Sequence, residues 1–218
     1  MRCKFAKIAV FLIFSLAFTG LAHSVEQCSD ILSNSFKKWK DVKDYTCTLT
    51  AYNRKGELED LKVYSYKFMK PNYVYMKIIK GKSKGAKVYY DPTTNRVKGC
   101  KKIFFYICRT FDPSAEKVTS IRGAKVYEST MGFALNNVKA FLDAGAACEV
   151  KEEKGCILLH LKAEKPVLGD VDEMRVCIDR SLGLPVWWEK FAGGVLVNKL
   201  ELEGIKLNVG LTKEDFKP

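Results

Sequence analysis

The sequence has 218 residues, with 37 Lys and Arg against 25 Asp and Glu, and therefore a formal net charge of +12. Without residues 1–24, which are assigned below to a cleaved segment, 218 − 24 = 194 residues remain, enough for one domain with a hydrophobic core and short for two. That segment holds three positive charges and no negative one, so the charge falls to +9. On an exported protein this favours anionic lipid head groups, lipopolysaccharide or an acidic partner over nucleic acid, and solubility alone explains it about equally well.

The first 24 residues have the order of a secretory signal peptide. Three basic residues among the first seven precede an apolar run from Ile8 to Phe18, and Ala22-His23-Ser24 offers small residues before a cut. A membrane-spanning helix needs about 20 apolar residues, and this run is about half as long. We expect cleavage near Ser24–Val25, a periplasmic protein without a lipid anchor, and a single domain over residues 25–218.

The next segment changes from helical to extended spacing. Apolar residues from Val25 to Val42 recur at helical intervals, which predicts an amphipathic helix. Side chains alternate from Tyr45 to Ala51 and from Leu61 to Phe68, so two strands should form a hairpin with a turn near residues 53–57. More strands are expected at residues 73–79, 86–90 and 96–111, the last including the apolar run 103–107.

The second half of the chain also has a predicted helix followed by strands. Ser129 or Thr130 should cap a helix that ends at Gly145, and strands are expected at residues 147–150, 156–163, 174–179, 185–191 and 195–207. Parallel neighbours would need a dozen or more residues between strands, and these connections are shorter. The sequence therefore predicts an α+β protein with one antiparallel sheet and two helices.

Seven cysteines remain after the signal peptide, so in an oxidising compartment they should pair and leave one over. Cys148 and Cys156 flank a turn at residues 151–155 and are expected to face each other across a hairpin. Cys28 and Cys47 form a second candidate pair, since a helix and the following strand can bring them back together. A reducing compartment would leave all of them as thiols.

No motif indicates catalysis or a metal. His160 is the single histidine after the signal peptide, and a surface role is favoured over acid–base chemistry. The segment Gly81–Ser83 lacks the earlier glycine of a phosphate-binding loop. Asp170, Asp172 and Glu173 lack the spaced ligands of a calcium loop. We therefore expect no enzyme activity and no cofactor.

Two other features favour binding. Lys82 and Lys84 lie in a lysine-rich turn that can contact an anionic membrane or partner. The predicted strands are also rich in aromatic side chains, which either fill a core or line a groove. These residues are Tyr64, Tyr66, Phe68, Tyr73, Tyr75, Tyr89, Tyr90, Trp187, Trp188 and Phe191.

Four short segments follow one another in an order that resembles the LolA-like outer-membrane lipoprotein-sorting superfamily, as a divergent branch. They are residues 68–76 (FMKPNYVYM), 88–92 (VYYDP), 184–189 (LPVWWE) and 211–216 (LTKEDF). The resemblance covers nearly all of residues 25–218. One departure is that residues 72–77 lack the arginine that helps to hold the closed form in the family, so opening and release would work differently here.

The resemblance implies a strongly curved antiparallel sheet, an incomplete β-barrel, with helices covering its concave face. It also implies a non-enzymatic carrier that holds acyl chains of lipoproteins or a related lipid and moves them toward the outer membrane, with inner- and outer-membrane transport components as partners. The alternative is an envelope sensor or interaction module on the same scaffold. A continuous cavity would favour the carrier, and its expected lining residues are Leu49, Val63, Met76, Val88, Phe133, Leu142, Leu159 and Trp187.

Overall fold

The computed structural model of the protein describes residues 25–102 and 104–218, and the predicted signal peptide lies outside them. Within these residues eleven strands form one sheet in the order β6-β5-β4-β3-β2-β1-β11-β10-β9-β8-β7, and all neighbours are antiparallel. The strands are β1 (Asp44–Lys55), β2 (Leu58–Met69), β3 (Tyr73–Lys80), β4 (Lys87–Asp91), β5 (Arg96–Lys102), β6 (Tyr106–Phe111), β7 (Ala147–Glu153), β8 (Cys156–Lys162), β9 (Glu173–Asp179), β10 (Pro185–Ala192) and β11 (Val195–Leu207).

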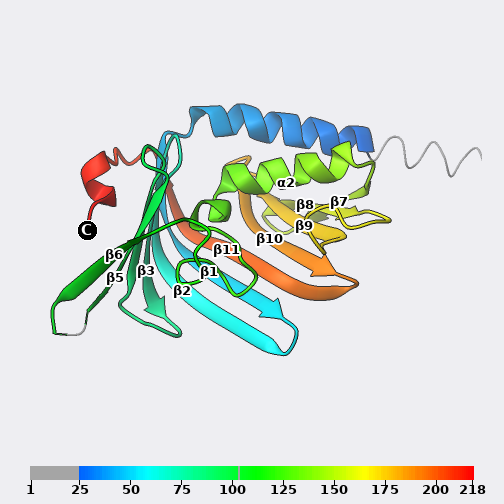
Figure 1. Ribbon diagram of the computed structural model, residues 1–218. Coiled ribbons are helices and arrows are strands. Elements are labelled where there is room, and N and C mark those ends of the chain that lie inside the picture. The colour runs from blue at the N-terminus through cyan, green and yellow to red at the C-terminus, as the bar shows by residue number, and fades with distance from the viewer. Residues whose placement is uncertain (1–24, 103) are drawn as a thin grey trace, which may run out of the picture.

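The sheet is strongly curved and not closed, because β6 and β7 are edge strands that do not pair with each other (Figure 1). An N-terminal helix over residues 25–41 and the helix α2 (Met131–Asp143) lie along its concave side (Figure 1). Two short 3-10 helices complete the described elements, η1 (Val126–Ser129) and η2 (Lys213–Phe216). The predicted α+β class and curved antiparallel sheet are confirmed.

Alternation along the strands determines which side chains reach the concave face. On β1, Tyr45, Cys47 and Leu49 are buried while the residues between them are only partly buried. The register brings Tyr66 and Phe68 of β2 to the same face. The rings of Tyr45 and Phe68 stack with centroids 5.0 Å apart, so the core forms between this face and the helices.

Helix α2 begins where the sequence predicts. The Thr130 side chain accepts a hydrogen bond of 3.1 Å from the Phe133 amide and caps the helix. Gly132 faces the N-terminal helix so closely that a Cβ atom there would lie 2.7 Å from the Trp39 ring. Glycine therefore allows the two helices to pack against each other.

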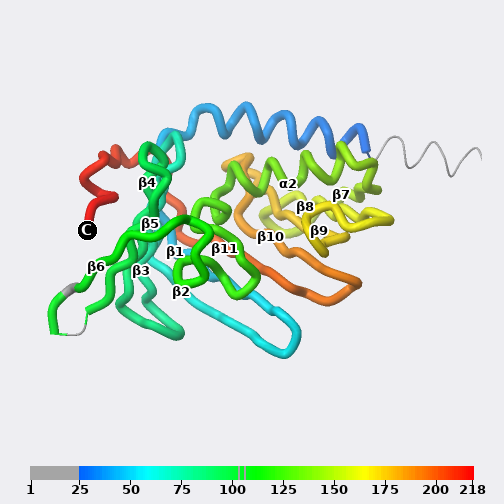
Figure 2. The backbone as a smooth tube through the Cα atoms, viewed as in Figure 1, coloured from blue at the N-terminus to red at the C-terminus, as the bar shows by residue number. Residues whose placement is uncertain are grey.

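The hairpin turns of four strand pairs lie along one edge of the sheet. These pairs are β1–β2, β3–β4, β5–β6 and β10–β11 (Figure 2). The prediction of continuous strand over residues 96–111 is wrong at its centre, because β5 ends at Lys102 and β6 starts at Tyr106. Phe104 and Phe105 of the apolar run therefore lie between the two strands, and Ile103 lies outside the described residues.

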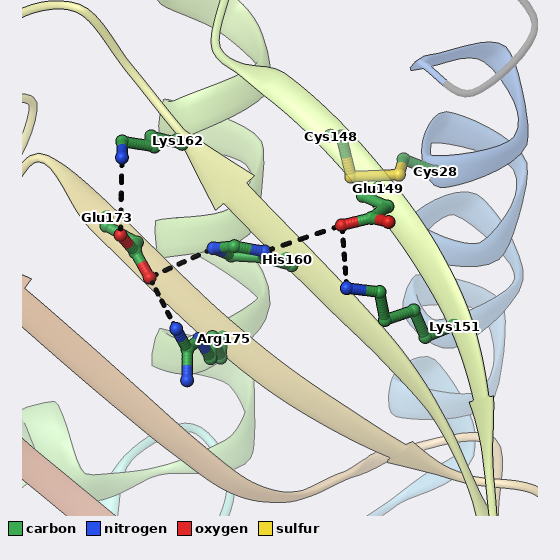
Figure 3. A network of polar contacts seen from close by, with 8 residues as sticks. All are labelled: Cys28, Cys148, Glu149, Lys151, His160, Lys162, Glu173 and Arg175. Carbon is green, nitrogen blue, oxygen red and sulfur yellow. Dashed lines mark hydrogen bonds and ion pairs between the residues drawn. A yellow bond between two sulfur atoms is a disulfide. The ribbon is translucent and has the colours of Figure 1, made fainter.

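Three disulfides link cysteines of the described residues. The remaining described cysteine, Cys47, is free and buried. The pairs are Cys28–Cys148, Cys100–Cys108 and Cys156–Cys177. Cys28–Cys148 joins the N-terminal helix to the edge strand β7 (Figure 3). Cys100 and Cys108 lie directly opposite each other on β5 and β6, with Cα atoms 4.1 Å apart.

Both predicted disulfides are wrong for geometric reasons. In the β7–β8 hairpin Glu153 pairs with Cys156, so Cys148 faces Leu161 instead of Cys156. Cys28 lies near the start of the described part of the N-terminal helix, whereas β1 begins beyond the end of that helix and carries Cys47 to the concave face of the sheet. Burial raises the pKa of the Cys47 thiol from 9.0 to about 12.

Candidate functional site

A cavity of about 430 Å³ lies on the concave face, within the range of about 300–1,000 Å³ common for small-ligand sites. Its floor is formed by β1, β2, β3, β4, β10 and β11. Its cover is formed by α2, by residues 117–129 before it and by the loop 168–171. The cavity therefore lies between the sheet and the segments that cross its concave side.

One end of the floor is polar because the strand register aligns four polar side chains in a row. Asn53 pairs with Asp60 on β2 and with Asn198 on β11, and Asn198 pairs with Lys190 on β10. All four line the cavity. This polar row lies near the turns of the β1–β2 and β10–β11 hairpins.

The floor becomes apolar with distance from those turns. On β1 the next inward-facing residues are Ala51 and Leu49, and Leu49 pairs with Tyr64 of β2. Met76 of β3 pairs with Val88 of β4 farther around the sheet, and both line the cavity. The cavity is therefore amphipathic, with a polar end and a long apolar wall.

Most charged groups at the polar end already have partners. Lys62 and Asp60 form an ion pair of 2.5 Å. Arg122 donates a hydrogen bond of 3.0 Å to the Arg54 carbonyl oxygen and also pairs with Asp170. These contacts hold the cover segment against the sheet.

Lys190 differs from these groups. Its Nζ atom lies 5.6 Å from the centre of the Phe133 ring, and among the described residues no carboxylate oxygen is within 4.0 Å of it. Burial lowers the pKa of Lys190 from 10.5 to about 8; the carboxylate of Glu128 opposes this shift and the charge of Arg122 adds to it. The cavity thus contains an ammonium group with unused hydrogen-bond donors.

Asn137 is the second incompletely paired group. It lies one helical turn after Phe133 on α2, lines the cavity and is 4% exposed. Its Nδ2 atom is buried and has no hydrogen-bond partner, the single such side-chain atom found in the described part of the chain. Leaving a buried donor unpaired costs about 1–3 kcal/mol, so the site holds a polar group at a cost to stability.

The structure brings together part of the predicted lining. Leu49, Met76, Val88 and Phe133 all line the cavity. Leu159 is fully buried in the core and Leu142 packs against the core, and neither reaches the cavity.

Val63 and Trp187 point to the other face of the sheet and do not line the cavity. In each strand the residue one position away faces the concave side instead. Their neighbours Lys62 and Trp188 face inward. Successive side chains on a strand alternate between faces, so an error of one position reverses the orientation.

Sequence reasoning missed Lys190 and Asn137. Asn137 did leave a signal, because it lies on the apolar stripe of α2 between Ala134 and Phe141. Lys190 shares a face with Trp188, but the sequence alone did not show which face of β10 is concave.

The edge that carries the hairpin turns exposes two further features. Lys82 and Lys84 are exposed in the β3–β4 turn, as expected. At the tip of the β5–β6 hairpin Phe104 is 91% exposed and Phe105 is 70% exposed. We call Phe104 and Phe105 the aromatic tip; both turns lie on the edge seen in Figure 2.

His160 belongs to a polar network on β7, β8 and β9, away from the cavity (Figure 3). Its Nε2 atom is 2.9 Å from a Glu173 oxygen, and its Nδ1 atom is 3.7 Å from Glu149. Arg175 donates to the same Glu173 oxygen at 3.0 Å. These groups satisfy one another across three strands, which is a structural role.

The acidic residues 170, 172 and 173 do not converge either. Asp170 pairs with Arg122, while Asp172 accepts a hydrogen bond of 3.1 Å from the Gly193 amide. Across residues 25–102 and 104–218, no group of three or more His, Cys, Asp or Glu is placed to hold a metal ion. No helix in the same residues has the length and apolar character needed to span a bilayer.

Comparison with solved structures identifies the fold. An uncharacterized conserved protein from Thermus thermophilus matches with a TM-score of 0.51 and 11% identity, over 88% of this chain and 93% of that one. The Mycobacterium tuberculosis lipoprotein LppX matches with a TM-score of 0.50 and 9% identity, over 86% and 98%. A LolA superfamily protein from Nitrosomonas europaea matches with a TM-score of 0.41 and 11% identity, over 88% and 97%.

The chain shares its fold with the Thermus protein and with LppX. This likeness concerns the fold alone, since the identities are low. No protein-family model matches the sequence, and no curated protein does. The predicted fold is therefore confirmed by three-dimensional similarity where sequence similarity is too weak to show it.

Proposed function

We propose that the protein is a non-enzymatic carrier that binds an acyl chain in the concave cavity, with a lipoprotein or a related lipid as cargo. The observation that carries this proposal is the amphipathic cavity of about 430 Å³, with Leu49, Met76 and Val88 on its apolar wall. Each methylene removed from water contributes about 0.8 kcal/mol, so a chain along this wall would be held by burial alone. The resemblance of the sequence to LolA-like carriers and the fold shared with the lipoprotein LppX support the same function.

The alternative function is an interaction module on the same scaffold, which would be expected to have a filled interior. The continuous cavity favours the carrier. The three disulfides also support export to an oxidising compartment, as the predicted signal peptide would provide. We place the mature protein in the periplasm, beginning near Val25.

We further propose that the edge of hairpin turns contacts an anionic membrane when cargo enters or leaves. Lys82 and Lys84 supply positive charge there, and the aromatic tip supplies apolar side chains that can enter the bilayer surface. The polar end of the cavity lies toward the same edge. Cargo would then have a short path between the bilayer and the apolar wall.

The variant Met76→Asp tests cargo binding. Met76 is 8% exposed and lines the cavity, so an aspartate there would put an unpaired charge where acyl chains should lie. Lipid that co-purifies with the mature protein, measured by mass spectrometry, should fall at least tenfold. Circular dichroism must show that the variant still folds.

Leu61→Asp is the matched control. Leu61 is 56% exposed and does not line the cavity, so this variant should keep its lipid. A folded Met76→Asp protein with a full lipid load would refute the carrier and favour the interaction module. Membrane contact is tested separately with Phe104→Ser and Phe105→Ser, which should weaken vesicle binding even at high salt while lipid content stays constant.

A further inference from the structure

Two donors that line the cavity have no acceptor among the described residues, and both lie next to Phe133 on α2. Lys190 and Asn137 come from opposite sides, from β10 on the floor and from α2 in the cover. Phe133 connects them, since Lys190 lies 5.6 Å from its ring and Asn137 follows it by one helical turn. A ligand with oxygen atoms next to these two side chains could accept the hydrogen bonds that they do not make within the protein.

We propose that the cavity binds a single-chain anionic amphiphile, whose carboxylate or phosphate oxygens accept hydrogen bonds from Lys190 Nζ and Asn137 Nδ2. Its tail lies along the apolar wall formed by Leu49, Met76 and Val88. This inference rests on the proposed function and narrows its cargo to one acyl chain with an anionic head.

The charges around the cavity favour an anion. The lining includes five basic and three acidic side chains, a net charge of +2: Lys62, Lys117, Arg122, Lys125 and Lys190 against Asp60, Glu128 and Asp170. Lys62 and Arg122 are neutralised by their partners Asp60 and Asp170. Lys190 is left without such a partner, so an anion would supply its missing counter-charge.

The size of the cavity favours one chain. Its volume of about 430 Å³ lies in the lower half of the range of about 300–1,000 Å³ for small-ligand sites. The polar row limits the apolar space on one side, and the fully buried core limits it on the other. A fatty acid or a lysophospholipid presents one tail and one anionic head to such a site.

The experiment compares palmitate, palmitoyl lysophosphatidic acid and hexadecanol as ligands of the delipidated mature protein, by titration calorimetry. An anionic ligand should bind about ten- to a hundredfold more tightly than hexadecanol, since charge-assisted hydrogen bonds are lost with the neutral head. The stronger of the two anions identifies the source of the oxygen, a carboxylate or a phosphate. Both rankings support the shared chemistry.

Two variants locate the head group. Lys190→Met should remove the advantage of the anions and weaken hexadecanol binding far less, while Lys154→Met, at the exposed β7–β8 turn, should alter neither. Asn137→Leu should weaken palmitate binding and raise the melting temperature, because it removes an unpaired buried donor. A merely structural amide would give a lower melting temperature and unchanged selectivity.

The outcomes separate this inference from the proposed function. Equal binding of palmitate, lysophosphatidic acid and hexadecanol would overturn the anionic head group and leave acyl binding intact. Failure of all three to bind a folded protein would refute the carrier itself. Unchanged selectivity in folded Lys190→Met would show that the head lies elsewhere.

Discussion

Removal of the Cys28–Cys148 disulfide should be the most destabilising loss of a single crosslink in this protein. The bond closes a loop of 120 residues, whereas Cys100–Cys108 closes one of 8 residues. In the chain-entropy model the longer loop contributes about 5 kcal/mol at 25 °C and the shorter one about 2.5 kcal/mol. Cys28 and Cys148 are also buried, so truncation to alanine adds a packing loss in the same direction.

The test is urea denaturation of Cys28→Ala/Cys148→Ala beside Cys100→Ala/Cys108→Ala. The free energy of unfolding should fall by about 4–6 kcal/mol in the first double variant and by about 2–3 kcal/mol in the second. Lipid content of folded protein should change little in either case, since none of these four cysteines lines the cavity. Equal losses, or a larger loss from the short loop, would refute the reasoning from loop length.

Three other perturbations have defined outcomes. Gly132→Ala should cost about 1–3 kcal/mol in urea, because the new Cβ would lie 2.7 Å from the Trp39 ring; an unchanged midpoint would contradict that close packing. Relative to Lys190→Met, the wild type should gain stability as the pH rises from about 8 to 10.5. In that range Lys190 is protonated in the unfolded chain but not in the folded chain, so the folded state is increasingly favoured. A difference in melting temperature that does not change with pH would contradict the lowered pKa. Lys82→Gln/Lys84→Gln should weaken binding to anionic vesicles severalfold at low salt and leave palmitate affinity unchanged; a salt-independent loss would argue against charge.

Local patterns predicted the elements well because each is encoded in a short segment. Alternation located β1 and β2, and Thr130 with the apolar stripe after it located α2. The aromatic tip was missed because its apolar side chains resemble those of a buried strand. The cross-strand pair Cys100–Cys108 requires the chain to turn back between these two cysteines, as it does in the β5–β6 hairpin.

The site was predicted less completely because it depends on which face of each strand is concave. Leu49 and Met76 do face the cavity, whereas Val63 and Trp187 face the other side of the sheet, because a shift of one residue reverses a side chain. The predicted disulfide pairings were wrong for a related reason, because they depend on the length of the β7–β8 turn and on where the N-terminal helix lies. The environment of Lys190 forms only when β10 and α2 pack against each other, and no local sequence pattern predicts that contact.

The free Cys47 gives the order of cysteines along the chain a kinetic consequence. If export proceeds from the N-terminus, Cys28 and Cys47 emerge first, and Cys148 follows 120 residues after Cys28. If export keeps pace with synthesis, at about 5–20 residues per second, Cys148 appears about 6–24 s later, long enough for a wrong Cys28–Cys47 bond to form.

Such a bond must be exchanged before the sheet closes over Cys47. Once buried, that thiol has a pKa of about 12, so almost none of it is the thiolate that attacks disulfides. In the folded protein, burial therefore keeps Cys47 from attacking the Cys28–Cys148 disulfide. A host with disulfide isomerase activity would speed the exchange of a wrong Cys28–Cys47 bond.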